Sequence, residues 1–226
     1  MSLLHLIRHG QASFGAEDYD VLSPTGIQQA RALGAHFAAA RLDAVYTGPR
    51  RRQRDTAEHL RDAARAAGAT LPETQLIDEF DEYPAFEIFK YVMPILLDSD
   101  EAIRALAAAS SDGRVFEEVI RRWLCGALDC GPHEAFDAFA VRVRRGLARV
   151  MAAEGRGRTV AVVTSGGPIS VAVQLALDLA PEVLLRLQAV TYNASISDFK
   201  FSADRLSLVT FNNINHLTGR APPTVR

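Results

Sequence analysis

Three short apolar segments, each followed by a helical pattern, constrain the fold of this chain most. Residues 3–7, 42–48 and 159–164 have the length and composition of buried strands. Helix signals follow each of them: Ser23 and Pro24 suit an N-cap and first turn, Gly68 suits a helix end, and Pro168 suits a helix start. Strands that alternate with helices favour a parallel sheet, because parallel strands need long crossover connections. We therefore expect an α/β fold, a three-layer α/β/α sandwich with a mostly parallel sheet.

The rest of the chain adds two features to this sheet. Between residues 83 and 150 the apolar residues follow helical spacing, which predicts a helical insertion over about 83–135 and then one return helix. Residues 195–201 and 206–214 flank a polar turn and predict a terminal hairpin that joins the sheet. No linker rich in Pro, Gly and Ser divides the chain, so residues 1–226 are expected to form one domain.

Composition excludes several classes of partner. The formal net charge is −2 with a pI near 6.3, which provides no general attraction to nucleic acid or to a membrane surface. No apolar run reaches 18 residues, and no leader pattern precedes the first strand. Cys125 and Cys130 are expected on different faces of one helix, where a disulfide does not form, and this favours the cytoplasm. We expect no cofactor and no metal, and the oligomeric state is left open.

The residues directly after the three strands suit an anion. Arg8 and His9 follow the first strand, the arginine run 50–54 follows the second, and Ser165-Gly166-Gly167-Pro168 follows the third. In such sheets ligands bind beyond the carboxyl ends of the strands. Guanidinium groups match phosphate oxygens, and backbone N–H groups at a helix start add positive potential. These features together indicate a phosphate pocket.

His9 is the candidate nucleophile of this pocket. A neutral imidazole nitrogen can take a phosphoryl group covalently. Its other nitrogen must then be held protonated, so that the free lone pair faces phosphorus, and we expect a backbone carbonyl to hold it.

The motifs at these positions resemble those of one known family. "LIRHGQAS", "LSPTGIQQARALG" and "GPRRRQRDTAEHL" resemble the signature segments of the histidine phosphatase superfamily, also called phosphoglycerate mutase-like. Counting back from Thr56 and Ala57, the resemblance makes Arg52 the second phosphate-binding arginine, with Arg8, and leaves the other arginines of the run on a solvated helix face. It also implies that Gly10 and Ser13 bind substrate, and that the reaction needs no metal.

The resemblance further implies an acid that protonates the leaving oxygen. The segment "LIDEFDEY" at 76–83 resembles the family's acid-bearing segment, and Glu79 is the best match. Asp78, Asp81 and Glu82 are close competitors. An acid that works near neutral pH needs a raised pKa, which burial or neighbouring carboxylates can supply.

Two departures from the family pattern bear on activity. Ser165 stands where the family has a second histidine, with Gly166 and Gly167 after it. Losing one such donor costs roughly 3–4 kcal/mol of transition-state stabilisation. His216, near the end of the chain, is a possible replacement. Where mutase-like members have Trp and Asn, this chain has Phe14 and Gly15, which disfavours a true mutase.

The sequence therefore predicts a phosphomonoester hydrolase that acts on a small phosphorylated substrate through a phosphohistidine on His9. Arg8 and Arg52 would bind the phosphoryl oxygens, and Glu79 would be the acid. Two alternatives remain: a phosphoglycerate mutase-type phosphoryl shuttle, and a weakly active or noncatalytic phospho-ligand or protein-binding member of the family.

Overall fold

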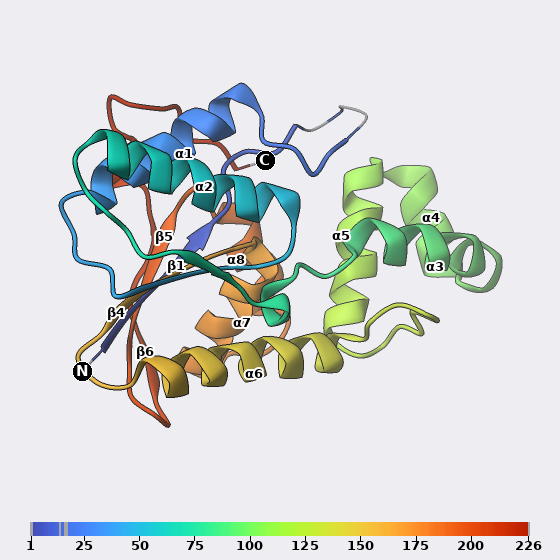
Figure 1. Ribbon diagram of the computed structural model, residues 1–226. Coiled ribbons are helices and arrows are strands. Elements are labelled where there is room, and N and C mark those ends of the chain that lie inside the picture. Colours follow the sequence, from blue (N-terminus) through green and yellow to red (C-terminus); the bar gives the residue numbers. More distant parts are fainter. Residues whose placement is uncertain (1, 14, 16–17, 226) are drawn as a thin grey trace.

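A computed structural model describes residues 2–13, 15 and 18–225, so Phe14 lies outside the described residues. A six-stranded sheet in the order β3-β2-β4-β1-β5-β6 forms its centre (Figure 1). The strands are β1 (Ser2–Arg8), β2 (Ala44–Thr47), β3 (Thr74–Leu76), β4 (Thr159–Thr164), β5 (Ile196–Phe201) and β6 (Leu206–Asn213). The predicted strand 159–164 has the observed bounds.

The sheet is mostly parallel, as predicted. Parallel pairing joins β1 to β4, β4 to β2, and β2 to β3. β5 runs antiparallel to β1, and β6 is antiparallel to β5, so the last two strands form the predicted hairpin. The carboxyl ends of β1, β2 and β4 consequently meet at one edge of the sheet.

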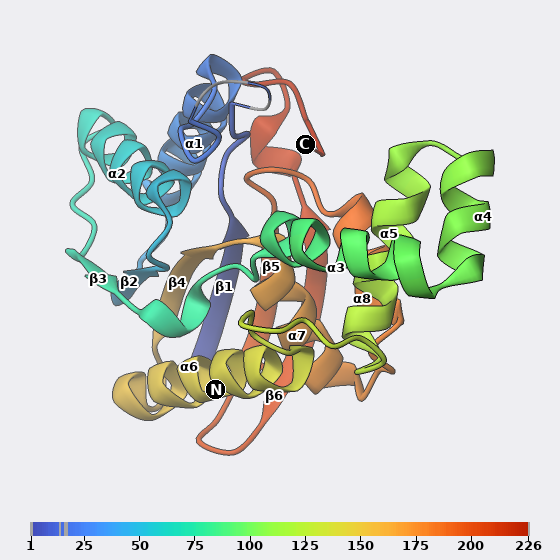
Figure 2. The ribbon, with the colours of Figure 1, turned by 90° about the vertical axis from the view of Figure 1, so that its right-hand side faces the viewer.

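Helices cover both faces of the sheet, which confirms the three layers (Figure 2). One face packs against α1 (Pro24–Phe37) and α2 (Arg51–Ala66), and the other against α6 (Phe136–Glu154) and α7 (Gly166–Leu177). β4 serves both cores because its side chains alternate: Val160 and Val162 face α6 and α7, whereas Ala161 and Val163 face α1 and α2. Although α6 has 19 residues, none of the helices in the described part could cross a membrane.

The local signals that predicted the helix ends are realised. Ser23 caps α1, and its Oγ accepts a hydrogen bond from the Gly26 N–H at 3.0 Å. Pro24 occupies the first helical position, where its missing N–H costs nothing. α2 ends at Ala66, and Gly68 takes the positive φ of 84° that turns the chain away from the helix.

The segment between β3 and α6 forms three helices that stand beside the sheet layers (Figures 1 and 2). They are α3 (Ala85–Ser99), α4 (Glu101–Ala109) and α5 (Asp112–Leu124). The short helix α8 (Val183–Val190) packs against α5 and α7. Two single 3-10 turns occupy Asp78–Phe80 and Asn215–Leu217. Trp123 of α5 stacks on Tyr83 with ring centroids 4.6 Å apart, which ties these helices to the core.

The two cysteines do not share a helix, which corrects the sequence-based expectation. α5 ends at Leu124, so Cys125 is its C-cap residue and Cys130 lies in the loop that follows. The positive φ of Gly126, 66°, marks where the chain leaves the helical path. Both thiols are free, as expected.

Candidate active site

The carboxyl ends of β1 and β4 lie side by side and bring the first and third strand-end motifs together. Arg8, the last residue of β1, is in register with Thr164, the last residue of β4. The pairing continues one residue further, because the His9 N–H donates to the Thr164 carbonyl at 2.8 Å. Ser165 and His9 therefore follow neighbouring strands directly.

His9 is buried, and its hydrogen bonds define the role of each ring nitrogen. Nδ1 lies 2.7 Å from the Gly10 carbonyl, which can only accept, so Nδ1 carries the proton and Nε2 carries the lone pair. Burial lowers the pKa of His9 well below 6.5, and the positive charges of Arg52 and Arg8 lower it further. The ring is therefore neutral at neutral pH, with Nε2 available as a nucleophile.

Arg52 contacts Nε2 of His9 directly. Its Nε donates to Nε2 of His9 at 3.0 Å, and its Nη1 donates to Oδ1 of Asp20 at 2.6 Å. The side chain is only 9% exposed, and the ring of Tyr19 lies 5.5 Å from its guanidinium carbon. Asp20 therefore holds the arginine against His9. Sequence reasoning did not identify Asp20, because only tertiary contact brings it to the start of α2.

Gly10 positions the His9 ring through its backbone. Its carbonyl fixes the His9 ring, and its N–H donates to Oγ1 of Thr56 at 3.0 Å. A Cβ atom on Gly10 would lie 2.5 Å from the Gly26 carbonyl oxygen, so only glycine allows α1 to approach this closely. Ser13 lies further along the loop, where its N–H donates to the Val21 carbonyl. It lines neither of the cavities described below.

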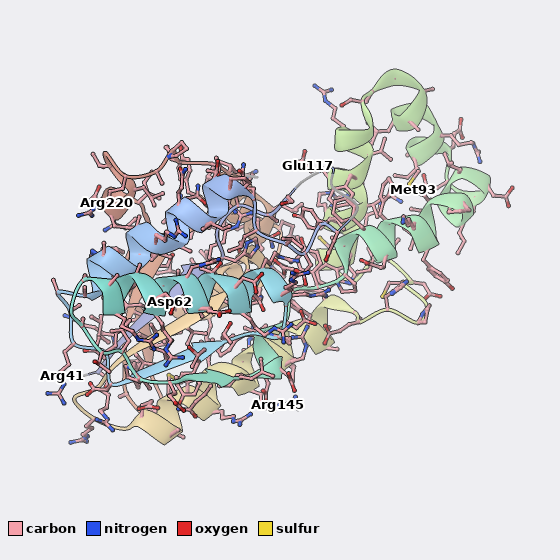
Figure 3. All side chains as sticks on the ribbon, turned by 45° about the horizontal axis from the view of Figure 1, so that its top comes forward. Arg41, Asp62, Met93, Glu117, Arg145 and Arg220 are labelled. Atoms are coloured by element: carbon pink, nitrogen blue, oxygen red, sulfur yellow. The ribbon has the colours of Figure 1, made fainter. Side chains whose placement is uncertain are left out.

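Glu79 does not lie in the pocket. Its carboxylate pairs with Arg145 and Arg149 of α6, at 3.5 and 3.4 Å. Figure 3 labels Arg145 at the outer surface of that helix. Residues 78–80 form a 3-10 turn, so side chains one position apart point in different directions, and Glu79 is directed away from His9.

Of the four candidate carboxylates at 78–82, Glu82 is the one that lines the cavity with His9. Its Oε2 accepts the Gly167 N–H at 3.0 Å, and its Oε1 accepts the Tyr83 N–H at 3.1 Å. Burial raises its pKa, although these hydrogen bonds and the charges of Arg52 and Arg8 oppose the shift. Raising the pKa keeps a proton on the carboxyl group to higher pH. Glu82 was among the competitors in the sequence, and position alone could not select it.

The remaining competitor with a defined partner is Asp81. Its carboxylate pairs with Nε of Arg50 at 2.5 Å. Arg50 is about one-third exposed and lines a cavity with His9, so the prediction that it lies on a solvated helix face is wrong. It belongs to the wall of the site because α2 begins directly beyond the end of β2.

Ser165 is fully buried, and its hydroxyl faces α2. Its Oγ lies 2.8 Å from Nε2 of Gln53, which also approaches the Phe80 carbonyl at 3.2 Å. Ser165 is the N-cap residue of α7, but its side chain caps no backbone N–H. The hydroxyl therefore contacts Gln53 and does not face the cavity that contains His9. The two glycines that follow lie closer to the site: the Gly167 N–H binds Glu82, and Gly166 lines a cavity.

Two cavities meet at Arg8, Glu82 and Tyr83. The smaller, about 180 Å³, contains His9, Arg50 and Arg52. The larger, about 310 Å³, extends toward α5 and α8. Arg8 donates through Nη1 to the carbonyl oxygens of Thr191 and of Val225, the latter at 2.9 Å. The guanidinium thus stands between the two spaces.

His216 lies elsewhere, so the compensating role that the sequence suggested for it is not realised. It lines a separate cavity of about 400 Å³ with His5, His36 and Asp198. Its ring centroid is 5.7 Å from that of His36, and it contributes to neither cavity beside Arg8. The 3-10 turn at Asn215–Leu217 packs against α1, which separates its side chain from His9.

Comparisons with known proteins agree with this geometry. The model of the histidine phosphatase superfamily (branch 1) matches residues 4–84 and 94–214. A putative phosphoserine phosphatase 2 from Hydrogenobacter thermophilus is 25% identical over 96% of this chain and 98% of its own length. Bacillus stearothermophilus YhfR, 18% identical, covers 96% of this chain and 100% of its own with a TM-score of 0.71.

A phosphoserine phosphatase from Entamoeba histolytica, solved in complex with phosphoserine, is 22% identical and has a TM-score of 0.66. That alignment covers 96% of this chain and 100% of the other. At these identities the solved structures establish a common fold. The family match spans nearly the whole chain and includes the strand-end motifs that converge on His9. The chain belongs to the histidine phosphatase superfamily.

Proposed function

We propose that this chain hydrolyses phosphomonoesters through a phosphohistidine on Nε2 of His9. One observation carries the proposal: a neutral buried imidazole contacts Arg52, and a carboxyl group of raised pKa, Glu82, shares a cavity with both. A nucleophile, an electrostatic clamp and a proton donor are the parts that this reaction requires.

In the first step the lone pair of His9 Nε2 attacks phosphorus. The N–P bond forms as the P–O bond to the alcohol breaks, and the phosphoryl oxygens replace His9 as the acceptor of the Arg52 Nε–H. Arg8 and Arg52 neutralise the charge that spreads over the phosphoryl oxygens. Glu82 gives its proton to the departing oxygen, so that the alcohol leaves neutral.

In the second step water releases the phosphoryl group. The Glu82 carboxylate takes a proton from the water as its oxygen attacks phosphorus. The N–P bond breaks, inorganic phosphate leaves, and both His9 and Glu82 return to their starting protonation states. The Gly10 carbonyl keeps Nδ1 protonated throughout.

Relatives support the assignment to phosphatases. The H. thermophilus protein is named as a putative phosphoserine phosphatase, and the E. histolytica protein is a phosphoserine phosphatase. A glucosyl-3-phosphoglycerate phosphatase of mycobacteria is a further structural neighbour. The substrates in these names contain different alcohols, but each is a phosphomonoester. The relatives therefore support phosphomonoester hydrolysis and do not identify the alcohol.

His9→Ala tests the proposal with an aryl phosphate as a generic substrate. We expect turnover to fall to the background rate, because no other nitrogen takes the place of Nε2. His59→Ala, on the outer part of α2, is the matched control and should keep the wild-type rate. Trapping of an acid-labile, alkali-stable phosphoprotein in wild type but not in His9→Ala would identify the intermediate. Undiminished turnover by His9→Ala would refute the mechanism.

The contact between Ser165 and Gln53 favours a second candidate, a member of the family that binds a phosphorylated ligand with little or no turnover. Ser165 Oγ accepts a hydrogen bond from Gln53, and Ser165 is not among the described residues that line the two cavities, which favours a phosphoryl site without a donor from this side chain. Purified wild-type protein would then bind vanadate or inorganic phosphate, and Arg52→Ala would not, while neither hydrolysed aryl phosphate above background.

A further inference from the structure

We propose that the larger cavity beside Arg8 binds the alcohol part of the substrate, and that it selects an alcohol carrying an ammonium group over one carrying a carboxylate. The inference rests on the proposed function, since it concerns the leaving group of the same reaction.

The position of Glu82 determines which cavity receives the alcohol. Glu82 and Arg8 line both cavities, whereas His9 and Arg52 line only the smaller one. A phosphoryl group at His9 fits within about 180 Å³. An ester oxygen within reach of Glu82 then lies at the junction, and the rest of the alcohol extends into the space of about 310 Å³.

The charges along this space oppose a carboxylate. Arg8 is the one cationic side chain among the described residues that line it, and Arg8 already faces the phosphoryl site and the Val225 carbonyl. At the far side stands Glu117 of α5, on the part of the insertion that lies nearest the core (Figure 3). A carboxylate on the alcohol would meet the like charge of Glu117, while an ammonium group would be attracted to it.

Aromatic side chains also make the lining of the larger cavity suited to a cation. Phe116 and Tyr83 line the space, and the faces of such rings attract ammonium groups. Tyr83 is held in place, because it stacks on Trp123 and its hydroxyl donates to Oε1 of Gln188 at 2.8 Å. That bond leaves the Nε2 group of the same amide for an oxygen of the ligand.

Two substrates of similar size separate the alternatives: ethanolamine phosphate, which carries an ammonium group, and 2-phosphoglycolate, which carries a carboxylate. For wild type we expect kcat/KM to be at least about fivefold higher for ethanolamine phosphate, the size of one exposed ion pair. Glu117→Gln should remove most of the preference, and Glu117→Lys should reverse it. An aryl phosphate with an uncharged ring serves as the reference, and the kcat/KM of each charged substrate is expressed relative to it for every variant.

Glu58→Lys is the matched control, because it makes the same charge change on the exposed surface of α2. It should leave the substrate ratio at the wild-type value. An equal or higher kcat/KM for 2-phosphoglycolate in wild type, or a ratio unmoved by Glu117→Lys, would overturn the inference.

Failure of the proposed function would look different, because then no phosphate ester, the aryl phosphate included, would be hydrolysed. Calorimetric binding of the same two compounds would still test the cavity. Tighter binding of ethanolamine phosphate, lost in Glu117→Lys, would support the inference, and equal binding of both compounds would overturn it.

Discussion

Nε of Arg52 donates a hydrogen bond to Nε2 of His9 across 3.0 Å, so the guanidinium group contacts the lone pair of the proposed nucleophile. The bond has two consequences. It orients the imidazole ring before substrate arrives, and with burial it holds the pKa of His9 low enough that the ring stays neutral. In the proposed reaction the phosphoryl group displaces Arg52 from Nε2 of His9, and its oxygens then accept the hydrogen bond that Arg52 donated to His9.

Replacing Arg52 by lysine should show how much of the catalytic activity depends on the several N–H donors of the guanidinium group. Arg52→Lys keeps the positive charge but loses the contact from Nε, and we expect kcat/KM for an aryl phosphate to fall by about 10² to 10³. Arg54→Lys, two residues further along on the exposed side of α2, should change kcat/KM less than about twofold. Equal effects of the two changes would mean that Arg52 acts only as a distant charge.

The two carboxylates of the segment 76–83 can be separated by a pair of amide variants. Glu82→Gln should lower kcat for an alkyl phosphate by about 10² or more, because the alkoxide then leaves without a proton. An aryl phosphate, with its better leaving group, should suffer less. Glu79→Gln, which loses only its contacts to Arg145 and Arg149, should retain wild-type kcat.

The dependence of kcat on pH tests the proposed role of the Glu82 carboxyl group independently. Because the pKa of Glu82 is raised, the acid form survives to higher pH than that of an ordinary glutamate, and kcat for an alkyl phosphate should fall as the pH rises through this pKa. Glu82→Gln should lack that alkaline limb. A limb that persists in Glu82→Gln and vanishes in Glu79→Gln would return the role of acid to Glu79.

The close approach of Gly167 to Glu82 can be tested by adding one methyl group. A Cβ atom on Gly167 would lie 2.0 Å from Oε1 of Glu82, whereas on Gly166 it would meet nothing nearer than Cγ of Gln188 at 3.8 Å. Gly167→Ala should therefore displace the carboxyl group and lower kcat/KM by about 10²-fold. Gly166→Ala should keep the activity within a fewfold, and thermal denaturation should verify that both variants fold.

Buried His216 should make the protein sensitive to acid. Its pKa is lowered to about 4, mainly by burial, while an unfolded histidine has a pKa near 6.5. The unfolded state therefore binds the proton first, so stability falls as the pH drops below 6.5. Between pH 7.5 and pH 5 the loss from this group is about 2 kcal/mol. Urea denaturation at both pH values should reveal a smaller loss in His216→Gln, whereas His59→Gln should keep the wild-type loss.

Placing a histidine at position 165 requires space that Gln53 now fills. Ser165→His alone should destabilise the fold by about 1–3 kcal/mol without raising kcat, because the larger ring enters a fully buried position. With Gln53→Ala added, the imidazole can reach the phosphoryl site, and kcat should rise above that of Gln53→Ala alone. Steady-state kinetics of the four proteins decides this, and a rise in Ser165→His alone would contradict the packing argument.

Local signals in the sequence predicted β1, β2, β4 and the terminal hairpin, and placed His9 at the end of the first strand, whereas the short β3 was not predicted. The strand at 159–164, the cap at Ser23 and the turn at Gly68 depend on neighbours within a few residues, so their pattern is legible without coordinates. His9 and the arginine run could be singled out because strand ends of a parallel sheet meet at one edge, a rule that needs only the order of elements. Arg52 was selected within that run by the resemblance to the family's second motif.

Tertiary structure alone decided which side chains complete the site. Glu79 and Glu82 lie three residues apart, and only the turn at residues 78–80 and the approach of Gly167 direct one outward and the other toward His9. Likewise, Ser165 is turned toward Gln53 and His216 toward His36 by packing between elements far apart in the chain. Such contacts leave no periodic trace in the sequence, because side-chain direction in turns and loops is fixed by the partners that surround it.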